Sequence, residues 1–149
     1  MGVSSSFPHL ALIPTGVYAE RAEWTAVHGL QPLRDELSRR AGRDSPLTIT
    51  SGYRSPALNA AIGGSDTSDH TTGWGVDIMV NGYTNHQVIR VLWDMVRAGQ
   101  VPMPDQAITY LHKGHLHLSW SDLHGGPPRG EWLTSYKGSN GKDKFRAWA

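Results

Sequence analysis

Apolar residues recur at helical spacing in the first third of the chain. Leu30, Leu33 and Leu37 lie three and four positions apart, with charged residues between them. A period of this kind places the leucines along one face of a helix. The pattern begins at about Ala19, and Gly42 is suited to end it because glycine readily adopts the left-handed conformation of a helix cap. We therefore predict a helix between these two residues.

Shorter stretches further along the chain predict strands and two more helices. Four of them have the alternation or the β-branched content of strands, namely residues 47–50, 76–80, 106–111 and 115–120. A helix is predicted to start at Ser55-Pro56, where serine can cap and proline fits the first turn. A further helix is predicted to be capped by Asn85, and its apolar side consists of Val88, Ile89, Val91, Leu92 and Met95.

These elements predict an α+β fold in which helices pack on one side of a small, mainly antiparallel sheet. A chain of 149 residues can bury one core, so we expect a single domain over residues 1–149. Residues 1–17 have no sustained period and are predicted to be an irregular lead-in. Residues 122–149 are rich in glycine, proline and charge, and are predicted to be an irregular tail anchored by Trp132 and Trp148.

Composition and charge exclude several classes of function. The net charge is +1 with the histidines neutral, which gives no electrostatic reason to bind nucleic acid or an anionic membrane. No apolar run is long enough for a membrane helix. Because the chain contains no cysteine, disulfides, thiolate zinc sites and cysteine nucleophiles are excluded. The N-terminus lacks the basic and apolar regions of a signal peptide.

The residues suited to chemistry gather in two separate segments. Residues 68–78 contain His70 and Asp77, and residues 112–117 contain three histidines. Asp77 lies in an apolar strand, where a buried carboxylate needs a metal or a cation as its partner. Two imidazoles and a carboxylate with an open position suit catalytic zinc, and the same set suits non-haem iron. The alternative is an aspartate on the solvent face of an edge strand.

The histidines of the second segment are predicted to share one face of a hairpin. His115 and His117 point the same way because strand side chains alternate. If Lys113-Gly114 is a two-residue loop, His112 lies opposite His115 and Tyr110 joins the same face. The other face then carries the apolar residues Leu111, Leu116 and Leu118. The alternative is that these histidines are exposed polar residues on a half-buried sheet.

Arg54 follows the first predicted strand and is a candidate for contact with substrate. Its guanidinium offers a planar fork to a carboxylate, or a cation to an oxyanion. The alternative is a surface arginine that caps a turn.

Three ordered motifs carry a family resemblance. They are Ser51-Gly52-Tyr53-Arg54-Ser55-Pro56 with Asn59 and Gly63-Gly64, then Ser68-x-His70-x-x-Gly73-x-Gly75-x-Asp77, and finally His115-x-His117. Together they resemble the zinc D-Ala-D-Ala carboxypeptidase family of peptidoglycan peptidases, which is peptidase family M15 of the subfamily A type. That family includes bacterial carboxypeptidases, phage endolysins and tail-associated lysins, and its fold is related to the hedgehog signalling domain. The resemblance covers roughly residues 26–120.

The resemblance implies roles for individual residues. Zinc would be the cofactor, and its ligands would be His70, Asp77 and His117. Arg54 would bind substrate or stabilise the oxyanion, and Ser68 would be a substrate-side neighbour of the first ligand.

The chain departs from the family pattern at Gly114. Many relatives have a glutamate or aspartate base at this position, three residues before the last ligand. The chain resembles instead the branch with His-x-x-His-x-His, in which a histidine takes the acid/base role. We expect His112 to be the base, because it lies across the turn nearer the mouth, and His115 to be the oxyanion partner. Tyr110 is a further candidate for contact with substrate.

The function implied is zinc-dependent hydrolysis of a peptidoglycan stem or cross-bridge peptide next to a D-amino acid, by a carboxypeptidase or an endopeptidase. The alternative is a zinc-retaining module without catalysis that binds cell wall or forms part of a virion. An iron oxygenase is disfavoured, since neither a His-x-Asp pair nor a many-stranded barrel is visible. Without a signal peptide, we expect a protein that stays in the cytoplasm until release, or one carried on a phage tail beside other virion proteins.

Overall fold

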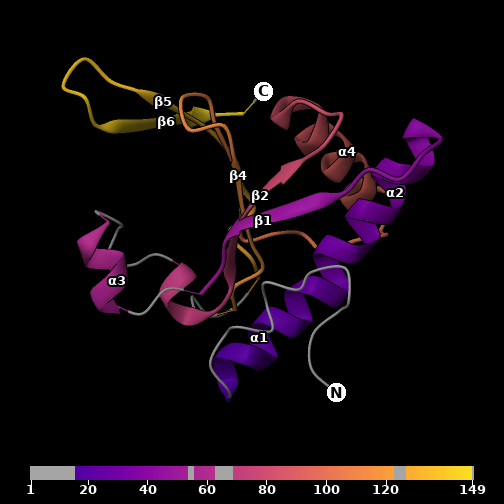
Figure 1. Cartoon of the computed structure of the whole chain (residues 1–149), viewed down its shortest axis with the longest axis horizontal. Helices are drawn as coiled ribbons and strands as arrows, with labels where there is room; N and C mark the ends of the chain where they lie inside the picture. The colour runs from indigo at the N-terminus through magenta and orange to yellow at the C-terminus, as the bar shows by residue number, and fades with distance from the viewer. Residues whose placement is uncertain (1–15, 54–55, 63–68, 123–126, 149) are drawn as a thin grey trace.

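The computed structural model describes residues 16–53, 56–62, 69–122 and 127–148 (Figure 1). The helical elements are α1 (Val17–Thr25), the π-helical turn η2 (Ala26–Leu30), α2 (Gln31–Ala41), α3 (Pro56–Ala61), the 3-10 turn η3 (Asp69–Thr72) and α4 (Asn85–Arg97). With a six-stranded, mostly antiparallel sheet beside them, they confirm the predicted α+β class. None of the described helices has the length and apolar character needed to cross a membrane.

The predicted N-terminal helix is confirmed as a continuous run of α1, η2 and α2. Its leucines at positions 30, 33 and 37 are fully buried, as their spacing requires. The run ends at Gly42, whose φ of 68° is the left-handed cap conformation that glycine adopts without strain. Within η2, Gly29 lies against the Trp120 ring, and a Cβ at this position would come within 2.6 Å of that ring. A glycine here lets the helix backbone pack directly on the tryptophan.

The sheet has the strand order β1-β2-β4-β3-β5-β6. Its strands are β1 (Leu47–Ser51), β2 (Gly75–Val80), β3 (Gln106–Tyr110), β4 (Leu116–Ser119), β5 (Glu131–Lys137) and β6 (Asp143–Ala147). All neighbouring pairs are antiparallel except β3 and β5, which run parallel. In the centre, Asp77 of β2 is the direct cross-strand partner of His117 in β4, which in turn faces Ile108 of β3.

Alternation along β2 and β4 separates a core face from a polar face. Val76, Ile78, Leu116 and Leu118 point into the core, where they join buried side chains of α1, α2 and α4. The residues between them in sequence point to the opposite face. The two metal-binding candidates on these strands therefore lie on the face of the sheet opposite the core helices α1, α2 and α4. The prediction that Leu116 and Leu118 are buried is confirmed.

Helix α4 supplies much of the helical side of the core. Its five predicted apolar residues, Val88, Ile89, Val91, Leu92 and Met95, are all buried. The cap is Thr84 rather than the predicted Asn85. Thr84 accepts a hydrogen bond from the Gln87 backbone N–H, and the Gln87 side chain accepts one from the Thr84 backbone in return. This reciprocal capping box satisfies two N–H groups at once, which an asparagine one position later does not do.

The loop between β3 and β4 differs from the prediction. Tyr110 N–H donates to the His115 carbonyl, so the loop consists of the four residues 111–114 and not of Lys113-Gly114 alone. Leu111 is 60% exposed, and the prediction that it is buried is wrong. A four-residue loop removes the direct opposition of His112 and His115, since His115 now pairs with Tyr110. The alternation rule was correct, but the length of the loop set the register.

The prediction that the C-terminal segment is irregular is wrong. Residues 131–137 form β5 and residues 143–147 form β6, and both extend the sheet. Trp132 and Trp148 pack against the core as predicted. Trp132 contacts Trp93 of α4 edge to face, with ring centroids 5.0 Å apart, and the Trp148 ring lies tilted against His86. That residues 1–149 form one domain stays a prediction, as does the lead-in, most of which lies outside the described residues.

Candidate metal centre

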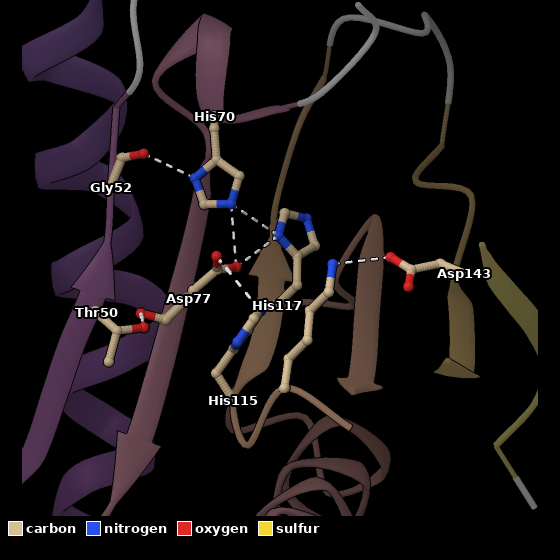
Figure 2. A network of polar contacts seen from close by, with 8 residues as sticks. Thr50, Gly52, His70, Asp77, His115, His117 and Asp143 are labelled. Atoms are coloured by element: carbon tan, nitrogen blue, oxygen red, sulfur yellow. Dashed lines mark hydrogen bonds and ion pairs between the residues drawn. The ribbon is translucent and has the colours of Figure 1, made fainter. Parts of the chain in front are cut away.

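Three side chains distant in sequence converge on the polar face of the sheet (Figure 2). His70 comes from η3, Asp77 from β2 and His117 from β4. His70 Nε2 lies 3.0 Å from Asp77 Oδ1, and His117 Nδ1 lies 3.1 Å from the same oxygen. The two ring nitrogens are 3.2 Å apart. All three residues are buried, and in the described part of the chain they are the group able to hold a metal ion.

The local sequence explains how each donor reaches this point. Antiparallel pairing of β2 and β4 sets Asp77 directly beside His117. His70 is brought over them by η3, which is closed by the Trp74 N–H and the Thr72 hydroxyl, both donating to the Asp69 carbonyl. The chain then reverses at Gly73, whose φ is 84°. A Cβ on Gly73 would lie 3.0 Å from the Tyr18 backbone, so the turn is packed against α1.

The separations of the donor atoms fit a tetrahedral metal. Zinc–nitrogen and zinc–oxygen bonds of about 2.0–2.1 Å place neighbouring ligand atoms of a tetrahedron about 3.3 Å apart. The three separations here are 3.0, 3.1 and 3.2 Å. The side chains would need to move only slightly to coordinate an ion together. They provide three of four positions, which is the arrangement of a catalytic rather than a structural zinc site.

The hydrogen bonding of His70 gives a chemical reason to expect a metal ion between the three side chains. His70 Nδ1 lies 2.7 Å from the Gly52 carbonyl oxygen, which can only accept, so Nδ1 carries a hydrogen. In the neutral imidazole, Nε2 then presents a lone pair toward Asp77 and His117. Electron-pair donors that face one another in a buried site are suited to a cation between them. A metal-binding histidine commonly donates its other ring N–H to a backbone carbonyl in this way.

Electrostatics favour the charged form of Asp77. Burial is the largest influence and raises the pKa of its carboxyl group, but the neighbouring His117 and His70 rings together lower it by more than burial raises it, so the pKa lies well below its usual value. The carboxylate is therefore ionised at neutral pH and available as a ligand. It is further oriented by its backbone, since the Asp77 carbonyl accepts a hydrogen bond from the Thr50 hydroxyl of β1.

The remaining histidines of the second segment go to different places. His115 Nε2 lies 3.5 Å from Asp77 Oδ2, and Tyr110 lies against its ring with centroids 4.8 Å apart. Burial lowers the pKa of His115, and the charge of Asp77 opposes this only in part. His112 instead lies 2.8 Å from Asp143 of β6. Lys113 donates to the other oxygen of the same carboxylate.

The structure thus brings His70, Asp77, His117 and His115 together and turns His112 outward. Two sequence candidates, Arg54 and Ser68, lie outside the described residues. Sequence reasoning missed the Gly52 carbonyl, although Gly52 was part of a recognised motif, because a backbone acceptor has no residue-type signature. It also missed Asp143, which lies in a segment predicted to be irregular.

Comparison with known families agrees with this site. A family model described as Peptidase M15 matches residues 12–119, which include all three donors and His115. The match ends at the last residue of β4, before β5 and β6. No curated protein matches the chain.

Proposed function

This chain belongs to the peptidase M15 family, and we propose that it is a zinc peptidase that hydrolyses peptidoglycan peptides next to a D-amino acid. The family is zinc-dependent and acts on peptidoglycan peptides near D-amino acids. The observation that carries the proposal is the buried convergence of His70, Asp77 and His117, whose donor atoms lie within 3.2 Å of one another. A purely structural cluster has no need for three facing electron-pair donors.

In this proposal the three converging residues hold zinc and leave one position open. When bound, zinc supplies a Lewis acid that polarises the scissile carbonyl and acidifies the attacking water. The Gly52 carbonyl fixes the orientation of the His70 ring. Substrate would approach from the face of the sheet opposite α1, α2 and α4, beside Tyr110 and His115. Arg54 and Ser68 stay proposed substrate contacts on the strength of the family motifs.

We assign proton transfer to His115 in preference to the sequence-based choice of His112. His115 Nε2 is close to Asp77 at 3.5 Å, and its side chain retains 20% exposure, which allows exchange of protons with solvent. His112 is occupied by Asp143. An imidazole is a suitable general base at neutral pH, and such a group contributes about 100-fold to 10,000-fold to the rate.

The test is digestion of purified peptidoglycan by the zinc-loaded protein, with the released muropeptides identified by mass spectrometry. We expect cleavage next to a D-amino acid, and loss of it in His70→Ala. His115→Ala should keep zinc and lose about 100-fold or more in turnover, whereas His112→Ala should stay close to the parent. His28→Ala is the matched control, because His28 is exposed on η2. If His112→Ala loses turnover and His115→Ala keeps it, the role of general base returns to His112.

A second candidate is a zinc-retaining module that binds cell wall without cutting it. It is favoured by Gly114, which stands three residues before His117 where many relatives have a carboxylate base. Zinc-loaded protein that sediments with peptidoglycan but releases no peptide would support this alternative. The products also separate the finer possibilities, since a carboxypeptidase releases single terminal D-amino acids and an endopeptidase opens cross-bridges. Roles as a phage endolysin or a tail-associated lysin, with other virion proteins as partners, remain proposals of the same kind.

A further inference from the structure

Two arginines from different elements contact the turn that carries His70. From α1, Arg21 donates to the Thr72 carbonyl at 2.8 Å, and its guanidinium lies over the Trp74 ring. From the segment before β5, Arg129 approaches Asp69, the residue directly before His70, at 3.8 Å. Arg129 lies beyond the segment that matches the family, so the family match assigns it no role.

Arg129 is itself firmly placed by Asp105. Its backbone N–H donates to Asp105 Oδ1 at 2.9 Å, and its Nε donates to Asp105 Oδ2 at 2.9 Å. Asp105 is 1% exposed, and its backbone joins the ends of two strands through bonds to Ser119 and Glu131. Nε and Nη2 of the guanidinium both donate to this one Oδ2 atom of Asp105, so the guanidinium has little freedom and its position relative to Asp69 is fixed by the sheet.

Asp69 depends on this cation. Its side chain is 4% exposed. Among the described residues, its Oδ2 atom is buried without a hydrogen-bond partner. A carboxylate removed from water needs a compensating charge, and in the part of the chain that the structure describes Arg129 is the cation paired with it. Asp105 and Glu131 share the same guanidinium, so loss of that cation would leave three acidic groups close together.

We propose that Arg129 is a positioning residue for the metal centre, which acts through Asp69 to hold η3 and thereby the His70 ring in place. The proposal rests on the zinc-binding role proposed for His70. Loss of Arg129 would drive Asp69 toward water, and the displacement would be transmitted along the backbone to the adjacent ligand. Arg21 does not replace Arg129 in this contact, because its guanidinium donates to the carbonyl of Thr72, at the opposite end of η3 from Asp69.

The first test is zinc affinity, measured by competition with a chromophoric chelator. Arg129→Gln should bind zinc roughly 10-fold more weakly, at the lower end of the loss usual for residues behind a metal ligand. Arg90→Gln, an exposed arginine on α4, is the matched control and should bind like the parent. If Arg129→Gln does not fold, Arg129→Lys keeps the charge without the fork and should show an intermediate loss. Parental affinity in a folded Arg129 variant would overturn the proposal.

A double-mutant cycle separates positioning from general stability. In an Asp69→Asn background no buried charge remains at Asp69, so adding Arg129→Gln should leave zinc affinity within about threefold. The loss of folding stability through Asp105 should persist in both backgrounds. If Arg129→Gln weakens zinc binding equally with and without Asp69, the effect does not pass through Asp69 and the proposal fails.

A third measurement needs no metal and is therefore independent of the proposed function. The Trp74 N–H donates to the Asp69 carbonyl and reports opening of the turn. In metal-free protein, hydrogen exchange at this amide should quicken about 10-fold or more in Arg129→Gln, because weaker local structure opens more often. Unchanged exchange would overturn the positioning role. If exchange quickens in Arg129→Gln but the parent protein binds no zinc, the role of Arg129 in positioning η3 stands and only the zinc function is refuted.

Discussion

Binding of zinc should raise the melting temperature by an amount that can be estimated. The three donors are preformed in the folded chain and dispersed in the unfolded one, so zinc should bind the native state selectively. At a free zinc concentration 100 times the dissociation constant, the stabilisation is about 2.7 kcal/mol. For 149 residues, an unfolding entropy of about 2.1 cal/mol/K per residue gives roughly 0.3 kcal/mol/K. The melting temperature should therefore rise by about 9 °C.

The assay is calorimetry of the metal-free protein and of the same protein with buffered zinc. The zinc-dependent rise should disappear in His117→Ala, and it should persist in His28→Ala, which removes an exposed histidine away from the cluster. Comparing the rise rather than the absolute melting temperature cancels the packing cost of truncating a buried ring. An equal rise in His117→Ala and parent would refute the assignment of this residue as a ligand.

Two further predictions concern the scaffold. Gly73→Ala should destabilise the fold by about 1–3 kcal/mol in urea titrations, because φ is 84° and the new Cβ would lie 3.0 Å from the Tyr18 backbone. An unfolding midpoint equal to that of the parent would contradict the tight turn. Hydrogen bonds from Arg39 and Arg40 lower the pKa of Glu36 to about 2, so its stabilising contribution is present above its ordinary value of 4.5 and is lost as pH falls toward 2. Glu36→Gln should accordingly be less stable than the parent at pH 6, and the difference should shrink below pH 4.5; a constant difference would refute this origin.

Much of the fold could be predicted because it follows from periodic burial. The leucines of α2, the apolar side of α4 and the alternation of β4 all report which face meets the core. Features set by pairing could not be predicted in the same way. Residues 131–137 become a strand because β3 offers a free edge parallel to them, and the sequence of that strand does not encode the presence of its partner. The four-residue loop after Tyr110 was missed for a similar reason, since Lys113-Gly114 is compatible with more than one loop length.

The sequence was sufficient to predict the metal-binding side chains of the candidate site, but not the residues that surround them. A carboxylate in an apolar strand and histidines in alternation are unusual enough to mark Asp77 and His117. The contact of His112 with Asp143 could not be foreseen, because Asp143 lies 31 positions away in a segment that the sequence does not predict to be a strand. Arg129 gave no signal at all, because an arginine between prolines and glycines resembles an ordinary surface residue until Asp69 and Asp105 are placed beside it.

The β5–β6 hairpin also decides where the sheet stops growing. In a chain cut after β4, the backbone N–H and C=O groups of β3 would form an open edge, which is a template for pairing with another molecule. β5 pairs with that edge, and β6 becomes the outermost strand; it is short, its residues are exposed, and its sequence is Asp-Lys-Phe-Arg-Ala. Charged side chains on a short strand discourage a further strand from adding. The family-matched segment 12–119, produced without this hairpin, would thus expose a strand edge prone to self-association. The hairpin therefore keeps the sheet from associating with other molecules, in addition to supplying Asp143, the partner of His112.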